Sequence, residues 1–218
     1  MAPLLSIMIL VLLTLLAIGP AMTWVSKGIS LVMFFLSGKL GPFVIVIFTL
    51  IYPWIVTTGM HSALAIARLE AITKRGFDPF TRVLTLLHNI TQGAATLAVV
   101  VRTKDEELRA TAISAALTVL CAGISEPCLY GVTLKYRKPM YSCMIGGFAG
   151  GIYVGIMGVN AYVFFMTPGL ITLPMWINPN NTGNLLNAVI SAAIAAIVTF
   201  VVQLFMGIDE PKQEAVSE

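Results

Sequence analysis

The segment Ala110–Leu134 reads ATAISAALTVLCAGISEPCLYGVTL, and its only charged residue is Glu126. A transmembrane helix needs roughly 20 apolar residues, so the segment is long enough to enter a bilayer. However, Gly123 permits unusual backbone angles, and Pro127 has no N–H with which to continue a helix. The sequence therefore predicts a helix that breaks at membrane depth, with a carboxylate at the break.

The composition of the whole chain is typical of an integral membrane protein. Of its 218 residues, 58% are hydrophobic and only 11% are charged, whereas a soluble domain carries about 25% charged residues. The net charge of +3 comes from loop clusters, so no nucleic-acid partner is expected. The chain has no P-loop and no zinc-ligand spacing. We therefore expect no metal, no cofactor and no catalytic residue, and the energy for any transport must come from a gradient or another protein.

Charged residues divide most of the chain into apolar stretches that we predict to be membrane spans. Pro3–Ser26 is interpreted as a retained span, because it lacks a basic start and exceeds the roughly 7–15 apolar residues of a signal peptide. The other predicted spans are Leu40–Ala67, Met140–Phe164 and Leu185–Met206. Basic residues favour the cytoplasmic side, so Lys135–Lys138 is predicted to be cytoplasmic, and so is the charged segment Arg68–Arg82.

Two segments differ from these spans because polar residues lie at their centres. Val83–Val101 contains Asn89 and Gln92, and Ala110–Leu134 contains Glu126. An unpaired polar group facing lipid costs several kcal/mol, and interrupted apolar segments often mark the binding site of a transporter. We predict that both segments are re-entrant hairpins that line a water-accessible cavity.

The polar residues of these segments suggest a site for hydroxyl groups. An intramembrane carboxylate is a functional candidate by default, and Glu126 can accept hydrogen bonds from two hydroxyls of a sugar. The alternative is that Glu126 caps a helix or pairs with a lysine or arginine. His61 can donate and accept, although a lone histidine is often a satisfied core residue, and His88 is a weaker candidate. Asn89 and Gln92 either bind sugar or stabilise the hairpin internally.

Four motifs resemble the membrane (IIC) component of the bacterial sugar phosphotransferase systems, in the glucose superfamily. The sequence GISEPCLYGV at 123–132 resembles the family signature GITEPAIYGV, and LKYRKPM at 134–140 is also similar to the family. The sequences TGMH at 58–61 and NITQGAATLAV at 89–99 are similar to the β-glucoside, sucrose and trehalose branch. The resemblance covers nearly the whole chain.

The resemblance implies an all-α polytopic membrane protein, whose transmembrane helices and two re-entrant hairpins form the transport-domain half of a IIC component. We expect a membrane-embedded, transport-domain-like region over residues 1–208, and the polar, acidic composition of 209–218 predicts a disordered tail, which the orientation of Lys135–Lys138 places in the cytoplasm. The sugar would lie near Glu126 with help from His61, and the motifs add Thr58, Asn89 and Gln92 as expected substrate-binding residues. The location would be the bacterial inner membrane, crossed several times.

The same resemblance implies protein partners. A phosphocysteine on a separate IIB protein, supplied through IIA, would phosphorylate the sugar, which is a glucoside or a disaccharide. None of the three cysteines here is expected to be that phosphocysteine, because Cys128 stands where alanine is usual and lacks a basic, hydroxyl-rich loop. The chain matches only the C-terminal half of a IIC component, so a missing N-terminal IIC half is a further expected partner.

Two alternatives remain open at the level of sequence. The chain could be a non-transporting remnant that acts as a membrane scaffold, or a solute carrier driven by an ion gradient. Sugar binding separates transport from the scaffold, and dependence on phosphoenolpyruvate separates it from the ion-coupled carrier. The motifs do not decide which sugar is bound, because several branches of the family share them.

Overall fold

The computed structural model describes residues 2–21, 24, 28, 31, 35, 43–164, 166–178 and 180–209. Throughout this part of the chain the secondary structure is helical, apart from isolated bridges that pair Asp78 with Ala161 and Asn178 with Asn181. Elements labelled α are α-helices and those labelled η are 3-10 or π-helical turns. In chain order they are α1 (Ala2–Leu13), η1 (Thr14–Ile18), α3 (Phe43–Thr57), η2 (Met60–Ala63), α4 (Leu64–Arg75), α5 (Thr81–Arg102), α6 (Glu106–Ala122), α7 (Glu126–Cys128), η3 (Leu129–Thr133), α8 (Leu134–Tyr136), α9 (Lys138–Met157), η4 (Leu170–Trp176) and α10 (Gly183–Met206).

Three of the described helices, α5, α9 and α10, are long and apolar enough to cross a membrane. A fourth span is formed if α3 and the following Met60–Arg75 segment are counted together, although they are bent by 114° at their junction. The predicted class, an all-α polytopic membrane protein, is therefore confirmed.

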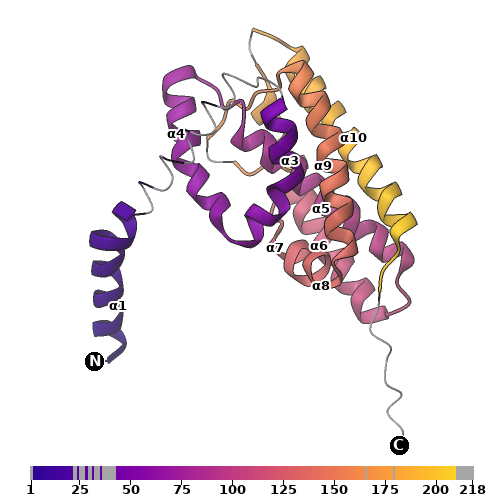
Figure 1. Cartoon of the computed structure of the whole chain (residues 1–218), viewed down its shortest axis with the longest axis horizontal. Helices are drawn as coiled ribbons and strands as arrows, with labels where there is room; N and C mark the ends of the chain where they lie inside the picture. The colour runs from indigo at the N-terminus through magenta and orange to yellow at the C-terminus, as the bar shows by residue number, and fades with distance from the viewer. Residues whose placement is uncertain are drawn as a thin grey trace, which may run out of the picture.

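Helix α5 lies at the centre of the packed helices and contacts α3, α6, α9 and α10 (Figure 1). Glycines on α9 allow close approach of its neighbours: a Cβ at Gly146 would lie 1.7 Å from Oγ1 of Thr199 on α10. A Cβ at Gly151 would lie 2.3 Å from Oγ1 of Thr49 on α3. Small residues allow membrane helices to pack backbone against backbone, and here they bring two helices onto opposite sides of α9.

The prediction of a re-entrant hairpin at Val83–Val101 is wrong. The segment lies within α5, which is one continuous helix of 22 residues. Its central polar side chains do not require a break in the backbone, because they are buried against neighbouring segments rather than against lipid. For example, Oγ1 of Thr133 donates a hydrogen bond of 2.7 Å to Oε1 of Gln92.

The second polar segment does contain the predicted break. Helix α6 ends at Ala122, Gly123 adopts a left-handed conformation with φ of 76°, and helix resumes at Glu126. A left-handed glycine is the usual way to end a helix. The break is thus where the sequence predicted it, while the re-entrant placement of this segment in a bilayer stays a prediction.

The ends of several predicted spans also differ from expectation. Leu40–Ala67 does not form one straight helix, because Gly59 with φ of 73° separates α3 from η2. Met140–Phe164 ends early, since Gly158 with φ of 66° terminates α9 after Met157. Leu185–Met206 falls within α10. Pro3–Ser26 is helical as far as residue 21, its remaining part is largely outside the described residues, and so is the tail at 210–218.

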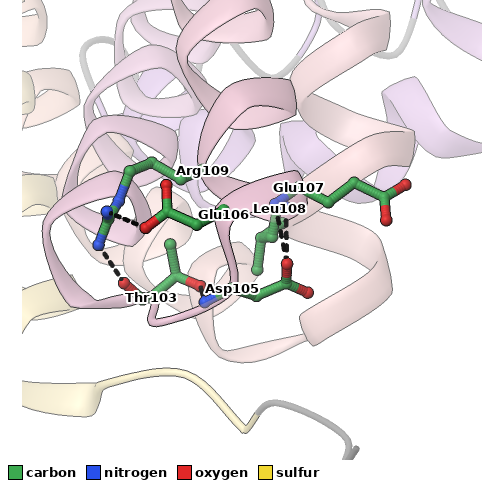
Figure 2. Close-up of polar contacts among 6 residues, drawn as sticks. All are labelled: Thr103, Asp105, Glu106, Glu107, Leu108 and Arg109. Carbon is green, nitrogen blue, oxygen red and sulfur yellow. Dashed lines mark hydrogen bonds and ion pairs between the residues drawn. The ribbon is translucent and has the colours of Figure 1, made fainter.

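The turn from α5 to α6 is held by polar contacts at the start of α6 (Figure 2). Oδ1 of Asp105 accepts hydrogen bonds from the backbone N–H groups of Glu107 and Leu108, at 2.9 and 3.3 Å. An aspartate at this position satisfies N–H groups that have no partner within the helix. Arg109 reaches back to the carbonyl oxygen of Thr103 at 2.8 Å and pairs with Glu106. This turn makes α5 and α6 an antiparallel pair, which returns the chain to the level of the cavity.

Candidate functional site

A cavity of about 600 Å³ lies between α3, α4, α5 and the break after α6. This volume is within the range of roughly 300–1,000 Å³ that is usual for small-molecule sites. Its polar lining includes His61, Arg68, Arg82, His88, Asn89, Ser125, Glu126 and Thr167. The residues that line the cavity therefore come from segments that lie far apart in the sequence, from Tyr52 on α3 to Thr167 before η4.

Glu126 lies in this lining as the first residue of α7, and its side chain is exposed. Within the described residues, the ion pairs are Lys74–Glu70, Arg109–Glu106 and Lys138–Asp209, and none of them involves Glu126. The alternative in which a lysine or arginine neutralises this carboxylate therefore finds no support in the described part of the chain. A carboxylate that is not engaged by a cation can accept hydrogen bonds from hydroxyl groups in the cavity.

Asn89 connects α5 to the break that presents Glu126. Its Nδ2 donates hydrogen bonds to the carbonyl oxygens of Gly123, at 2.9 Å, and Pro168, at 2.8 Å. Only glycine fits at position 123, because a Cβ there would lie 2.5 Å from the carbonyl oxygen of Pro168. The amide donors of Asn89 thus stabilise the turn, while its Oδ1 is buried and has no hydrogen-bond partner among the described residues.

Two histidines face the same cavity. Nδ1 of His61 is buried with no hydrogen-bond partner, and both ring nitrogens of His88 are in the same state. The His88 ring lies edge-on to the ring of Tyr52, with centroids 5.5 Å apart. Sequence reasoning offers little ground for preferring His88, because a histidine in the middle of an apolar segment is usually a core residue. His88 lies seven residues after Thr81, the first residue of α5, and therefore about two helical turns along that helix.

Two of the expected substrate-binding residues do not line the cavity. Gln92 is fully buried, and its Oε1 accepts the hydrogen bond from Thr133. Thr58 is exposed, and its hydroxyl donates to the carbonyl oxygen of Ile55 at 2.8 Å. The geometry therefore brings together Glu126, His61 and Asn89, and leaves Gln92 and Thr58 outside the lining.

Sequence reasoning missed the two arginines of the cavity, Arg68 and Arg82, because both belong to a charged segment expected to be a cytoplasmic loop. Arg82 is only 4% exposed and donates from Nη2 to the carbonyl oxygen of Phe164 at 2.6 Å. The Arg68 guanidinium lies 4.9 Å from the centre of the Phe164 ring. A signal was available at Asp78, since an aspartate shortly before an apolar run predicts a helix start and places Arg82 within the helix.

Asp78 fixes the start of α5 and so the position of Arg82. Its carboxylate accepts hydrogen bonds from the backbone N–H groups of Phe80, Thr81 and Arg82, each at 2.9 Å. The hydroxyl of Thr81 also donates to it. Backbone pairing of Asp78 with Ala161 ties this helix start to the loop after α9.

A polytopic helical protein with a polar cavity at a helix break has the architecture of solute transporters. The chain belongs to the family of the phosphotransferase system EIIC, whose model matches residues 1–147. This range includes all the cavity residues named above except Thr167.

Curated relatives agree with this family. The chain is 31% identical over 217 residues, 99% of its length, to the arbutin-, cellobiose- and salicin-specific EIIBC component of Escherichia coli. It is 33% identical over 90% of its length to the sucrose-specific EIIBC component of Bacillus subtilis, and 31% identical over 73% to the trehalose-specific EIIBC component of E. coli. It spans 44%, 42% and 33% of those relatives, which is less than half of each. No solved structure matches the chain significantly.

Proposed function

We propose that the chain binds a sugar in this cavity and carries it across the bacterial inner membrane. It does so as the IIC subunit of a phosphoenolpyruvate-dependent phosphotransferase system, and presents the sugar to a separate IIB protein for phosphorylation. The observation that carries the proposal is the position of Glu126, an unpaired carboxylate at a helix break that opens on a cavity of sugar size.

The chemistry of the cavity supports a neutral polyhydroxylated ligand. The carboxylate of Glu126 accepts hydrogen bonds from hydroxyls, His61 can donate or accept through its ring, and Oδ1 of Asn89 is a further acceptor. Hydroxyl recognition by buried polar groups is selective, since a ligand that lacks the hydroxyl leaves those groups unpaired. The apolar side chains of Val56, Leu64 and Ile124 complete the lining and can cover the apolar faces of a sugar ring.

The named substrates of the relatives support a class of sugar. Arbutin, cellobiose, salicin, sucrose and trehalose are all glucosides, and four relatives with these or related names all carry a IIB part fused to the membrane part. We therefore propose a glucoside or glucose-containing disaccharide as substrate, IIB and IIA proteins as partners, and a second IIC segment as a further partner. Residues 1–208 would be the membrane-embedded region.

The test is sugar binding by the purified chain and by its Glu126→Gln variant. A hydrogen bond to a charged group contributes about 1.5–3 kcal/mol, so the variant should bind salicin or trehalose about ten to a hundred times more weakly. Glu107→Gln is the matched control, because it removes an exposed carboxylate at the start of α6, away from the cavity. Its affinity should equal that of the wild type.

The same experiment separates this function from its alternatives. If Glu126→Gln binds every glucoside as tightly as the wild type, the carboxylate is structural and the proposed site is wrong. Uptake in cells that express the chain with IIB and IIA partners should require phosphoenolpyruvate and persist when the proton gradient is collapsed. Uptake that follows the gradient instead would identify an ion-coupled carrier.

A further inference from the structure

The guanidinium of Arg82 is buried in the cavity wall with most of its hydrogen-bonding capacity unused. An arginine side chain has five N–H donors and carries a permanent positive charge. The contact found for Arg82 is the hydrogen bond from Nη2 to Phe164, and its Nε is buried without a partner. Burial of a charge without a counter-charge is costly, so such groups are usually paired or bind an ion.

A second guanidinium lies in the same wall, and neither forms a direct ion pair within the described residues, although the carboxylate of Asp78 is near enough to interact with both charges. Nε of Arg68 is also buried without a partner, and both arginines contact Phe164. Among the ion pairs of the described residues, none includes Arg68 or Arg82. The nearest carboxylate in sequence, Asp78, accepts four hydrogen bonds at the start of α5. The wall therefore holds two positive charges and one carboxylate that is engaged by the backbone.

Arg82 and Glu126 reach the cavity from different elements, the start of α5 and the break after α6. Asn89 is seven residues after Arg82 on α5, which corresponds to roughly 10 Å along the helix axis at about 1.5 Å per residue. Asn89 in turn contacts Gly123, at the break that presents Glu126. The cavity thus combines a carboxylate at the helix break with two guanidinium groups that come from α4 and from the start of α5.

We propose that Arg82 and Arg68 form an anion subsite that binds the phosphomonoester group of the phosphorylated sugar before its release. This inference rests on the proposed function and extends it to the product. The planar guanidinium fork matches phosphate oxygens in a bidentate geometry that lysine cannot reproduce. In this arrangement the guanidinium groups bind the negative phosphate, and the acceptors of Asn89 and Glu126 bind the remaining hydroxyls of the sugar.

A phosphate group could also come from free phosphate or from a lipid headgroup, and the experiment separates these sources. The full chain is placed in phosphatidylcholine nanodiscs, and calorimetry measures the affinities of salicin, salicin 6-phosphate and inorganic phosphate. A second preparation contains phosphatidic acid. Arg82→Lys keeps the buried charge but removes the bidentate geometry of the guanidinium group, while Arg68→Gln removes a charge at a less buried position. Arg75→Gln is the matched control, since Arg75 is exposed and outside the cavity lining.

The wild type should bind salicin 6-phosphate at least about tenfold more tightly than salicin. Both Arg82→Lys and Arg68→Gln should lose about ten- to a hundredfold in affinity for salicin 6-phosphate, and this loss should exceed any change in their affinity for salicin. Arg75→Gln should match the wild type for both ligands. Inorganic phosphate should bind more weakly than salicin 6-phosphate, with the same dependence on the two arginines.

Three results would overturn the subsite. The first is wild-type affinity for salicin 6-phosphate in both arginine variants. The second is a wild type that binds salicin but binds salicin 6-phosphate no more tightly, a result that leaves the proposed function intact. The third is arginine-dependent binding of phosphatidic acid that excludes salicin 6-phosphate. If salicin does not bind at all, the proposed function fails for this glucoside, and arginine-dependent binding of inorganic phosphate then decides whether the subsite exists.

Discussion

Replacement of Asn89 by leucine should destabilise the protein, because it removes two hydrogen bonds that hold the helix break in place. The side chain is 1% exposed, and its Nδ2 donates to the carbonyl oxygens of Gly123 and Pro168, which belong to two different segments. Leucine is larger than asparagine, so the substitution removes both donors and also crowds a buried site, which adds to the cost. It leaves two carbonyl oxygens at the break without the amide that now satisfies them.

The expected cost follows from these two bonds. Hydrogen bonds between membrane helices contribute about 1–2 kcal/mol each in model systems, and a buried acceptor without a donor costs about 1–3 kcal/mol. Two such bonds predict a loss of about 2–4 kcal/mol in the free energy of unfolding. The matched control is Thr91→Val on the same helix, which removes a hydroxyl bonded at 2.9 Å to the carbonyl oxygen of His88. That oxygen already accepts a bond within the helix, so the control should lose less than about 1 kcal/mol.

The assay is unfolding of the purified chain by a denaturing detergent, followed by helical circular dichroism. Accessibility of the break is measured in parallel with a thiol reagent at Cys121, which lies two residues before Gly123 and is partly buried. Asn89→Leu should shift the midpoint and increase the labelling rate, while Thr91→Val should do neither. Equal, small effects of the two substitutions would refute the reasoning that Asn89 holds the break in place.

Two further predictions concern helix packing and orientation. Gly146→Ala should lower the free energy of unfolding by about 1–3 kcal/mol, because the new Cβ would lie 1.7 Å from Oγ1 of Thr199. Gly131→Ala is the control and should be tolerated, since the nearest atom to its Cβ is 3.9 Å away. Equal unfolding midpoints of the two variants would contradict this packing. A cysteine at Lys138, in a background without native cysteines, should react with impermeant reagents only from the cytoplasmic side, and labelling from outside in intact cells would reverse the orientation.

Several features of this protein follow directly from its sequence. The low content of charged residues determined the membrane class, because few charges can be buried in lipid. The break at Gly123 was also predictable, since glycine and proline flank a carboxylate within five residues and each limits the helical backbone locally. The sequence also contains Gly146, Gly147, Gly150 and Gly151, a helical spacing of small residues that allows membrane helices to pack closely. These are local properties that depend on a residue and its near neighbours.

Other features were decided by tertiary structure. The sequence of Val83–Val101 is compatible with either a hairpin or a buried helix, because periodicity does not reveal whether a polar residue will find a partner elsewhere. Helix α5 stays continuous because Gln92 meets Thr133, and Asn89 meets Gly123, at separations of 41 and 34 residues. The hydrogen bond from Thr133 also holds the Gln92 side chain in the packed interior, outside the cavity lining.

The arginines illustrate this limit most clearly. From the sequence alone, Arg68 and Arg82 belong to a charged segment typical of a solvated loop, and nothing in their spacing indicates a shared site. The structure starts α5 at Thr81 and folds α4 back at the 114° bend, so both guanidinium groups reach the cavity that holds Glu126. The sequence by itself determined the membrane class, the helix break and its carboxylate; only the tertiary structure decided which distant side chains meet that carboxylate, because such meetings depend on how whole helices pack.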